Sequence, residues 1–132
     1  MTDLTALLSE PGTSIAVIGA SDHPSKYGGI IYRDLKGKGF PVFAVNPNRD
    51  TVDGDPCWPS VTDLPETPTI ADFVVPAHVG VDVLEECAVA GITNIWVQPG
   101  AHSRAMKSAL EAGGFNWVAD ICIMVRAGEA VS

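Results

Sequence analysis

Residues 15–29 carry the strongest fold signal in the sequence: Ile15-Ala-Val-Ile-Gly-Ala-Ser-Asp-His-Pro-Ser-Lys-Tyr-Gly-Gly29. It opens with a β-rich apolar run that ends at Gly19. Small residues directly after a strand let a phosphate approach the backbone N–H groups, and a following helix aims its positive end at the same point. Ser21 and Ser25 add hydroxyl donors, and Lys26 adds a point charge. The stretch predicts a ligand loop between a strand and a helix, with an ordinary glycine-rich turn as the alternative.

The glycines of this loop follow neither common phosphate-binding spacing. The GxGxxG fingerprint of dinucleotide-binding folds is shorter and has fixed positions, and no Gly-Lys-Ser/Thr follows as in a Walker A loop. Pro24 also falls inside the loop. The pattern therefore indicates a phosphate-bearing ligand without specifying a dinucleotide.

Outward from this stretch, apolar runs alternate with amphipathic stretches. Continuous Val/Ile runs are typical of strands buried on both faces, and strand–helix alternation favours right-handed crossovers within a parallel sheet. The fold class expected is α/β: a single domain over residues 1–132, with a parallel sheet of about five strands and helices on both faces. Strands are expected at 15–18, 42–45, 70–75, 94–97 and 117–119, and helices at 2–9, 29–38, 79–90 and 103–112.

Two segments give weaker signals. The connection 46–69 carries five prolines and little periodicity, and a helical turn is expected within it near 60–64. The apolar stretch 121–125 is either a further strand or a packed tail. On the helix expected at 79–90, we place Cys87 on the buried face and Glu85-Glu86 toward solvent.

Charge limits the possible partners. The 132 residues carry 16 acids against 8 bases, a net charge of −8, so nucleic acid and anionic membranes are not expected as partners. Five bases nevertheless fall within residues 26–49, which makes a small anionic ligand possible there; the alternative is that they only solvate a helix. The acidic N-terminal segment and the lack of a long apolar run predict a cytoplasmic location.

Ligands of open parallel sheets bind outside the carboxyl ends of the strands. At the second strand end, Asn46-Pro47 stands where a dinucleotide-binding domain places an acid, and Arg49 follows. This weakens the dinucleotide interpretation and suits a phosphate near the ribose, although Asn-Pro is also a common turn starter. At the fourth strand end, Gln98 could donate to a planar group and Gly100 leaves room for it, or the segment is only a turn.

In order along the chain, the residues that carry a family resemblance are Val17-Ile-Gly-Ala-Ser21 with Lys26 and Gly28-Gly29, Val45-Asn-Pro47, Pro76, Ile95-Trp-Val-Gln-Pro-Gly100, Asp120 and Cys122. This set resembles the small stand-alone CoA-binding proteins. Those are single Rossmann-like domains, similar to the N-terminal CoA-binding domain of the succinyl-CoA synthetase alpha subunit. The resemblance covers about residues 12–126.

The resemblance implies coenzyme A or an acyl-CoA as the ligand. It places the CoA diphosphate on the first loop, the adenosine ribose and its phosphate on the second, and the pantetheine along Pro76 and the turn at 98–100. Val74 and Val75, just before Pro76, are apolar where many relatives carry polar or basic residues, and Ile121 stands where relatives often have arginine. The implied binding residues are Gly19, Ala20, Ser21, Ser25, Lys26, Tyr27, Gly28, Asn46, Pro47, Arg49, Pro76, Gln98, Pro99 and Gly100.

No catalytic residue and no metal site are expected. His23, His78 and His102 follow predicted strand ends but show no HxH or HxxxH spacing, and the three cysteines show no CxxC spacing. Cys57 is the cysteine expected in an exposed loop. Domains of this type bind a cofactor while another domain or subunit usually supplies the catalysis.

The function expected is therefore non-catalytic binding of CoA or an acyl-CoA. An acyl-CoA enzyme is a possible partner, and a homodimer is possible by analogy with relatives. Two alternatives remain open: an NAD(P)-binding component of an oxidoreductase, and an interaction module without a nucleotide ligand.

Overall fold

The protein, described over residues 2–131 by a computed structural model, places its most apolar strand, β1 (Ile15–Ile18), at the centre of a seven-stranded sheet. The other strands are β2 (Val42–Val45), β3 (Thr51–Val52), β4 (Asp55–Trp58), β5 (Ile70–Phe73), β6 (Asn94–Val97) and β7 (Asn116–Ala119). The helices are α1 (Tyr27–Gly37), α2 (Ala77–Ala90), α3 (Arg104–Ala112) and α4 (Ile123–Val131), with short 3₁₀ helices η1 (Thr5–Ser9) and η2 (Val61–Asp63).

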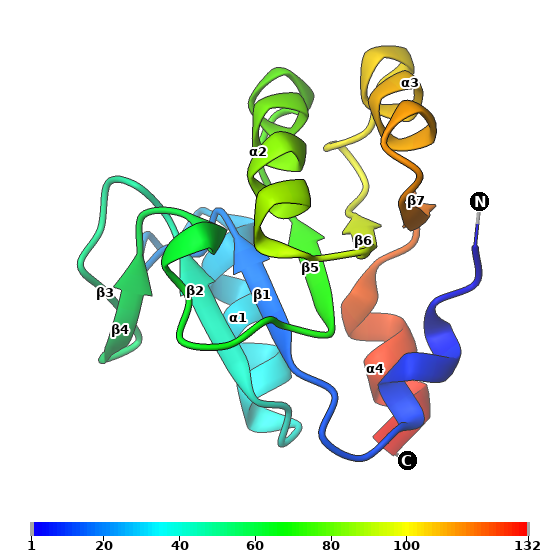
Figure 1. The fold of residues 1–132 in the computed structure, drawn as a ribbon. Coiled ribbons are helices and arrows are strands. Elements are labelled where there is room, and N and C mark those ends of the chain that lie inside the picture. Colours follow the sequence, from blue (N-terminus) through cyan, green and yellow to red (C-terminus); the bar gives the residue numbers. More distant parts are fainter. Residues whose placement is uncertain (1, 132) are drawn as a thin grey trace.

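The strand order is β3-β4-β2-β1-β5-β6-β7, so strands are added on one side of β1 first and on its other side afterwards (Figure 1). The chain first builds outward from β1 to β2 and β4, and then returns to the other side of β1 with β5. All strand pairs are parallel except β3 with β4. The space between the carboxyl ends of β1 and β5 is therefore the switch point at which sheets of this kind bind ligands.

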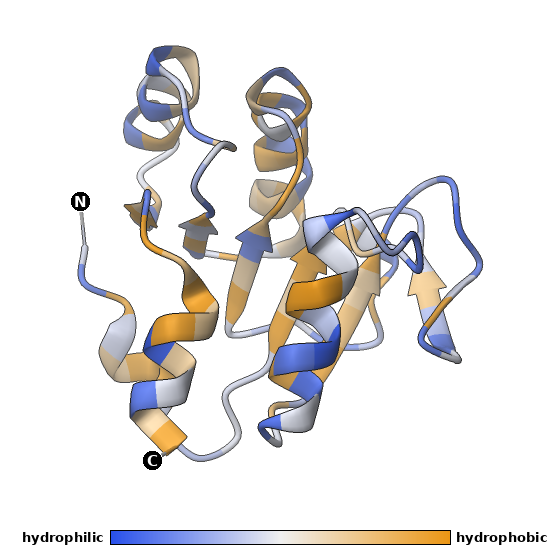
Figure 2. Ribbon diagram, turned by 180° about the vertical axis from the view of Figure 1, so that it is seen from behind, coloured by the Kyte–Doolittle hydropathy of each residue, from blue (hydrophilic) through white to orange (hydrophobic). Residues whose placement is uncertain are grey.

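Two hydrophobic cores lie on opposite faces of the sheet. α2 and α3 cover one face, where Phe73 and Met106 are fully buried. α1, α4 and η1 cover the other, where Tyr32 and Trp96 are buried. The strands at the sheet centre are mostly hydrophobic, whereas α1 alternates hydrophobic and hydrophilic turns (Figure 2). This is the predicted three-layer α/β class. Within residues 2–131, every helix is too short or too polar to cross a bilayer.

The count of about five strands was too low, because the proline-rich connection contains the β3–β4 hairpin. Asp53 and Gly54 form its turn with φ angles of 52° and 77°, and two consecutive positive φ angles are typical of the tight type I′ turn that an Asp-Gly pair favours. Cys57, which we expected in an exposed loop, lies half-buried in β4. Pairing of β4 with β2 explains this, because it places Cys57 beside Ala44 inside the sheet.

Of the two alternatives for the segment 121–125, a strand is wrong: the segment packs on the core as the start of α4, which begins at Ile123. The Gln98 side chain starts this helix: its Oε1 accepts a hydrogen bond from the Ile123 N–H at 2.9 Å, in buried surroundings. A side chain distant in sequence supplies the cap, so local periodicity could not reveal it.

Candidate ligand-binding site

A cavity of about 520 Å³ opens at the switch point, above the carboxyl ends of β1, β2 and β5. Its walls come from the first loop, the second loop, the segment after β5 and one side of α2. The lining residues are Ile18, Gly19, Ser21, Lys26, Val45, Asn46, Pro47, Asn48, Pro59, Val74, Val75, Pro76, Val79, Asp82, Val83 and Glu86. The volume is within the range of small-molecule sites, which starts at about 300 Å³.

The first loop packs directly on the start of α1. A Cβ on Gly28 would lie 1.9 Å from the Gly19 carbonyl oxygen, and one on Gly29 would lie 2.1 Å from that of Ser21. Gly19 itself has a φ of +96°, a conformation that favours glycine. These glycines are therefore required by close backbone approach, which gives a physical reason for the glycines predicted at this loop.

The helix that follows the loop has an N-terminus without a side-chain cap. Lys26 is the N-cap of α1 and its side chain accepts no hydrogen bond, whereas Ser103 caps α3 by accepting from the Met106 N–H at 3.0 Å. Free N–H groups and the helix dipole favour an anion at such an end, and the Lys26 ammonium adds a full charge beside the cavity. This end of the cavity is suited to phosphate.

Asn46 links the first two loops. Its Nδ2 donates to the Ala20 carbonyl oxygen at 2.9 Å, and its Oδ1 accepts from the Asn48 N–H at 2.9 Å. An asparagine here holds both loops, a task for which an aspartate lacks the donor. Arg49 does not line the cavity; its guanidinium lies 3.8 Å from the Asp22 carboxylate.

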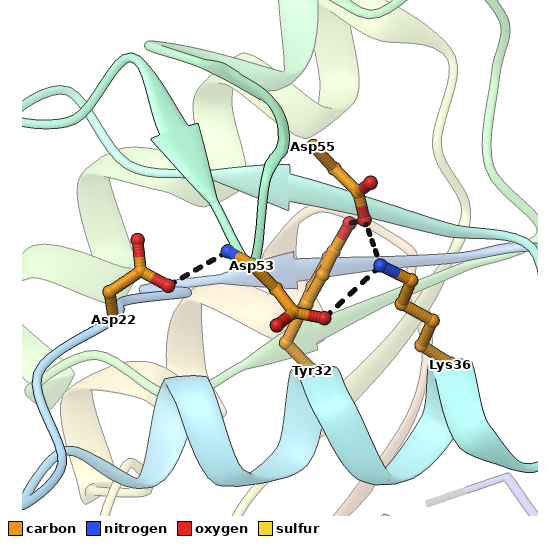
Figure 3. Close-up of polar contacts among 5 residues, drawn as sticks. All are labelled: Asp22, Tyr32, Lys36, Asp53 and Asp55. Carbon is orange, nitrogen blue, oxygen red and sulfur yellow. Dashed lines mark hydrogen bonds and ion pairs between the residues drawn. The ribbon is translucent and has the colours of Figure 1, made fainter.

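A polar network joins the β3–β4 hairpin to α1 and to the first loop (Figure 3). The Lys36 ammonium lies 3.1 Å from an Asp53 oxygen and 2.8 Å from an Asp55 oxygen, and the Tyr32 hydroxyl donates to the same Asp55 oxygen at 2.7 Å. The Asp53 N–H donates to the Asp22 carboxylate at 2.8 Å. These bonds raise the pKa of Lys36 and lower that of Asp55. The hairpin therefore supports the first loop from outside.

Replacing Tyr32 with phenylalanine is expected to lower the free energy of unfolding by about 1 kcal/mol, because Asp55 loses a donor while the buried ring stays. Chemical denaturation measures the change. Tyr27→Phe is the matched control, since that tyrosine is 62% exposed. If both substitutions change the free energy of unfolding equally, the hydrogen bond from Tyr32 to Asp55 adds no stability beyond that of an exposed hydroxyl.

We did not predict from the sequence that α2 forms one wall of the cavity. Val79, Asp82, Val83 and Glu86 line the cavity from α2. Their spacing of three and four residues places them on one face of the helix, and this mixed stripe is the signal that could have revealed the wall. Glu86, which we expected to face solvent, is half-buried, and its carboxylate accepts a hydrogen bond from the Ser60 hydroxyl.

Several predicted residues do not line the cavity. The Gln98 amide, expected to face a ligand, is instead buried against α4, where it also contacts the Cys122 thiol at 3.5 Å. Ala20 and Gly28 are buried, Tyr27 is exposed to solvent, and Ser25 bonds to His23. The structure brings Gly19, Ser21, Lys26, Asn46, Pro47 and Pro76 together around the cavity and leaves out Ala20, Ser25, Tyr27, Gly28, Arg49, Gln98, Pro99 and Gly100.

The three histidines have separate surroundings. His23 bonds to Ser25, His78 is exposed at the start of α2, and His102 packs against Trp117 with ring centroids 5.6 Å apart. Within residues 2–131, no group of three or more His, Cys, Asp or Glu side chains could hold a metal ion. Burial raises the pKa of the Cys87 thiol to about 12, so this thiol stays protonated at neutral pH.

A glycine-lined loop and a cavity at the switch point of an open parallel sheet are characteristic of Rossmann-like nucleotide-binding domains. The comparison with known families gives the particular class: residues 13–128 match the family described as CoA binding domain, and the chain belongs to that family.

The chain is similar to much longer proteins and to small ones. It is 42% identical over 73 residues to the ADP-forming acetate–CoA ligase I of Archaeoglobus fulgidus. The aligned residues make up 55% of this chain and 11% of the ligase. The chain spans 11 to 12% of the length of the first curated relatives it matches. A conserved hypothetical protein of Pyrococcus furiosus superposes with a TM-score of 0.82 at 46% identity, covering 85% of this chain and 97% of that one.

Two further solved structures support the fold. A protein from Thermus thermophilus is 32% identical with a TM-score of 0.85, covering 97% of this chain and 96% of that one. An acetyl-coenzyme A synthetase of Candidatus Korarchaeum cryptofilum is 29% identical with a TM-score of 0.74, covering 91% of this chain and 28% of the synthetase. The same domain therefore occurs both in a small chain and within a large enzyme.

Proposed function

We propose that the chain binds coenzyme A or an acyl-CoA in the switch-point cavity and carries out no reaction of its own. The observation that carries the proposal is the cavity itself, which has an uncapped helix N-terminus and Lys26 at one end and, along the rest, mostly apolar walls that also carry Asp82 and Glu86. A CoA molecule has this same division, with phosphates beside a ring and a long, weakly polar arm. Membership of the CoA binding domain family supports this ligand.

The absence of catalysis is also a proposal. It rests on what lines the cavity: the titratable side chains there are Lys26, Asp82 and Glu86, and the lining contains no histidine and no cysteine. Because the chain matches only a small part of the curated CoA ligases, we extend the proposal to an acyl-CoA enzyme as partner. Release of free thiol from acetyl-CoA in the presence of the protein is expected to stay at the rate in buffer.

The ligand is tested by thermal shift and calorimetric titration with CoA, acetyl-CoA, NAD and NADP. We expect CoA or acetyl-CoA to stabilise the protein by about 2.7 kcal/mol at a hundred times its dissociation constant, and the other two to have no comparable effect. Lys26→Glu is expected to weaken binding about tenfold or more, because it replaces a charge-assisted contact with repulsion.

Lys107→Glu is the matched control, since it makes the same charge change on α3 and outside the cavity. If CoA and acetyl-CoA leave the melting temperature unchanged, or if both substitutions weaken binding equally, the proposal is wrong. Preferential binding of NAD or NADP would instead support the oxidoreductase alternative.

A further inference from the structure

The wall of the cavity on α2 carries two carboxylates that phosphate binding does not use. Asp82 and Glu86 both line the cavity, and neither forms an ion pair among residues 2–131. Negative side chains repel the phosphates of the proposed ligand. This part of the cavity therefore suits an uncharged part of the ligand that donates hydrogen bonds.

The cavity is polarised along its length. The first loop and Lys26 lie at the carboxyl edge of the sheet, where α1 begins. The Glu86 carboxylate contacts the Ser60 hydroxyl, and Ser60 follows β4, which β2 separates from β1. Glu86 therefore lies on the β4 side of the cavity, across β2 from the first loop, which follows β1.

Between these ends the walls suit a flat ring. Val79 and Val83 line the cavity from α2, and Val45, Pro47 and Pro59 line it from the segments that follow β2 and β4. Apolar surface from different elements favours an aromatic ring in such a slot. A nucleotide with its phosphates at Lys26 would place its base here, with one edge toward Glu86.

Glu86 is held in place before any ligand arrives. The Ser60 hydroxyl donates to its Oε1, and the Ser60 side chain also accepts from the Thr62 N–H at 3.2 Å, which caps η2. A half-buried carboxylate with one oxygen fixed in this way keeps capacity to accept a further hydrogen bond, and it has no donor of its own. The base edge that fits it is one that carries an amino group.

We propose that Glu86 selects the base of the bound ligand by accepting a hydrogen bond from the 6-amino group of adenine, with Asp82 keeping the phosphates at the opposite end. This inference rests on the proposed function, because it concerns the same cavity. It makes Glu86 a residue that determines specificity for the base, in addition to the loop residues that hold phosphate.

The test compares CoA with an analogue whose purine carries hydrogen in place of the 6-amino group. The unmodified protein is expected to bind CoA about tenfold or more tightly than the analogue, because the analogue leaves the carboxylate without its donor. In Glu86→Leu the preference should fall below about twofold, since leucine offers no acceptor. Calorimetric titration gives both dissociation constants for each protein.

Glu85→Leu is the matched control, because it makes the same change on the exposed side of α2 and should keep the full preference. Equal affinity of the unmodified protein for CoA and the analogue would overturn the inference while leaving CoA binding intact. So would a preference that persists in Glu86→Leu. Failure of the unmodified protein to bind CoA at all would overturn the proposed function and this inference together.

Discussion

Replacing Gly28 with alanine is expected to lower the free energy of unfolding by about 3 kcal/mol or more and to weaken CoA binding. The new Cβ would lie 1.9 Å from the Gly19 carbonyl oxygen and 2.7 Å from its carbonyl carbon. Both atoms belong to the backbone, so no side chain can rotate away. Either α1 or the loop must move, and the loop is the segment proposed to hold phosphate.

Gly37→Ala separates this clash from any general effect of alanine in the helix. Gly37 also lies in α1, and a Cβ there would meet nothing within 4 Å. Because alanine has the higher helix propensity, Gly37→Ala is expected to raise the free energy of unfolding by up to about 1 kcal/mol. Urea denaturation of both variants gives the comparison. A Gly28→Ala protein as stable as the unmodified protein would show that the loop adapts to the new methyl group.

The fold could be predicted from sequence where local and global signals agree. The Val/Ile strands and the alternation with helices gave the α/β class, since a strand such as Ile15–Ile18 has no exposed face on which polar residues could alternate. The hairpin was missed because prolines obscured its short strands, although Asp53-Gly54 is a recognised hairpin signal. α4 depends on a cap from Gln98, which is distant in sequence.

The site was predictable where backbone geometry imposes residue types. Gly19 and Asn46 are needed for a positive φ and for a bridge between loops, and both stood out in the sequence. The wall formed by α2 did not stand out in the sequence, because valine and glutamate are common on helices. Val79 and Glu86 line the cavity only because of the helix face on which they lie. The Gln98 amide caps α4 and does not line the cavity, and the sequence could not separate a helix cap from a ligand contact because both use the same amide chemistry.

Asp72 lies at the centre of the sheet and is fully buried. Its neighbours across the strands are Val17 and Trp96, and neither carboxyl oxygen has a hydrogen-bond partner among residues 2–131. Burial without a partner raises the pKa of this carboxyl well above its usual value of 3.8. The folded protein therefore holds a proton on Asp72 at pH values where the unfolded chain has lost it.

This sign predicts that Asp72 makes the folded state less stable as pH rises. Below about pH 4 the Asp72 carboxyl is protonated in both the folded and the unfolded state, so it gives stability no pH dependence there. Between that pH and the raised pKa only the folded state holds the proton, so the free energy of unfolding falls as pH rises. In Asp72→Asn, which has nothing to ionise, the fall in stability between pH 4 and pH 8 should be smaller than in the unmodified protein.

Asp72→Val removes the polar group altogether and is expected to raise the free energy of unfolding at pH 8 by about 1–3 kcal/mol, because the apolar neighbours then contact an apolar side chain. Urea denaturation at several pH values measures both variants, with Asp50→Asn as the control for losing an exposed acid. If the two Asp72 variants follow the pH dependence of the control, the carboxyl does not titrate with folding. A higher free energy of unfolding for Asp72→Val than for the unmodified protein at pH 8 would show that the buried carboxyl destabilises the sheet.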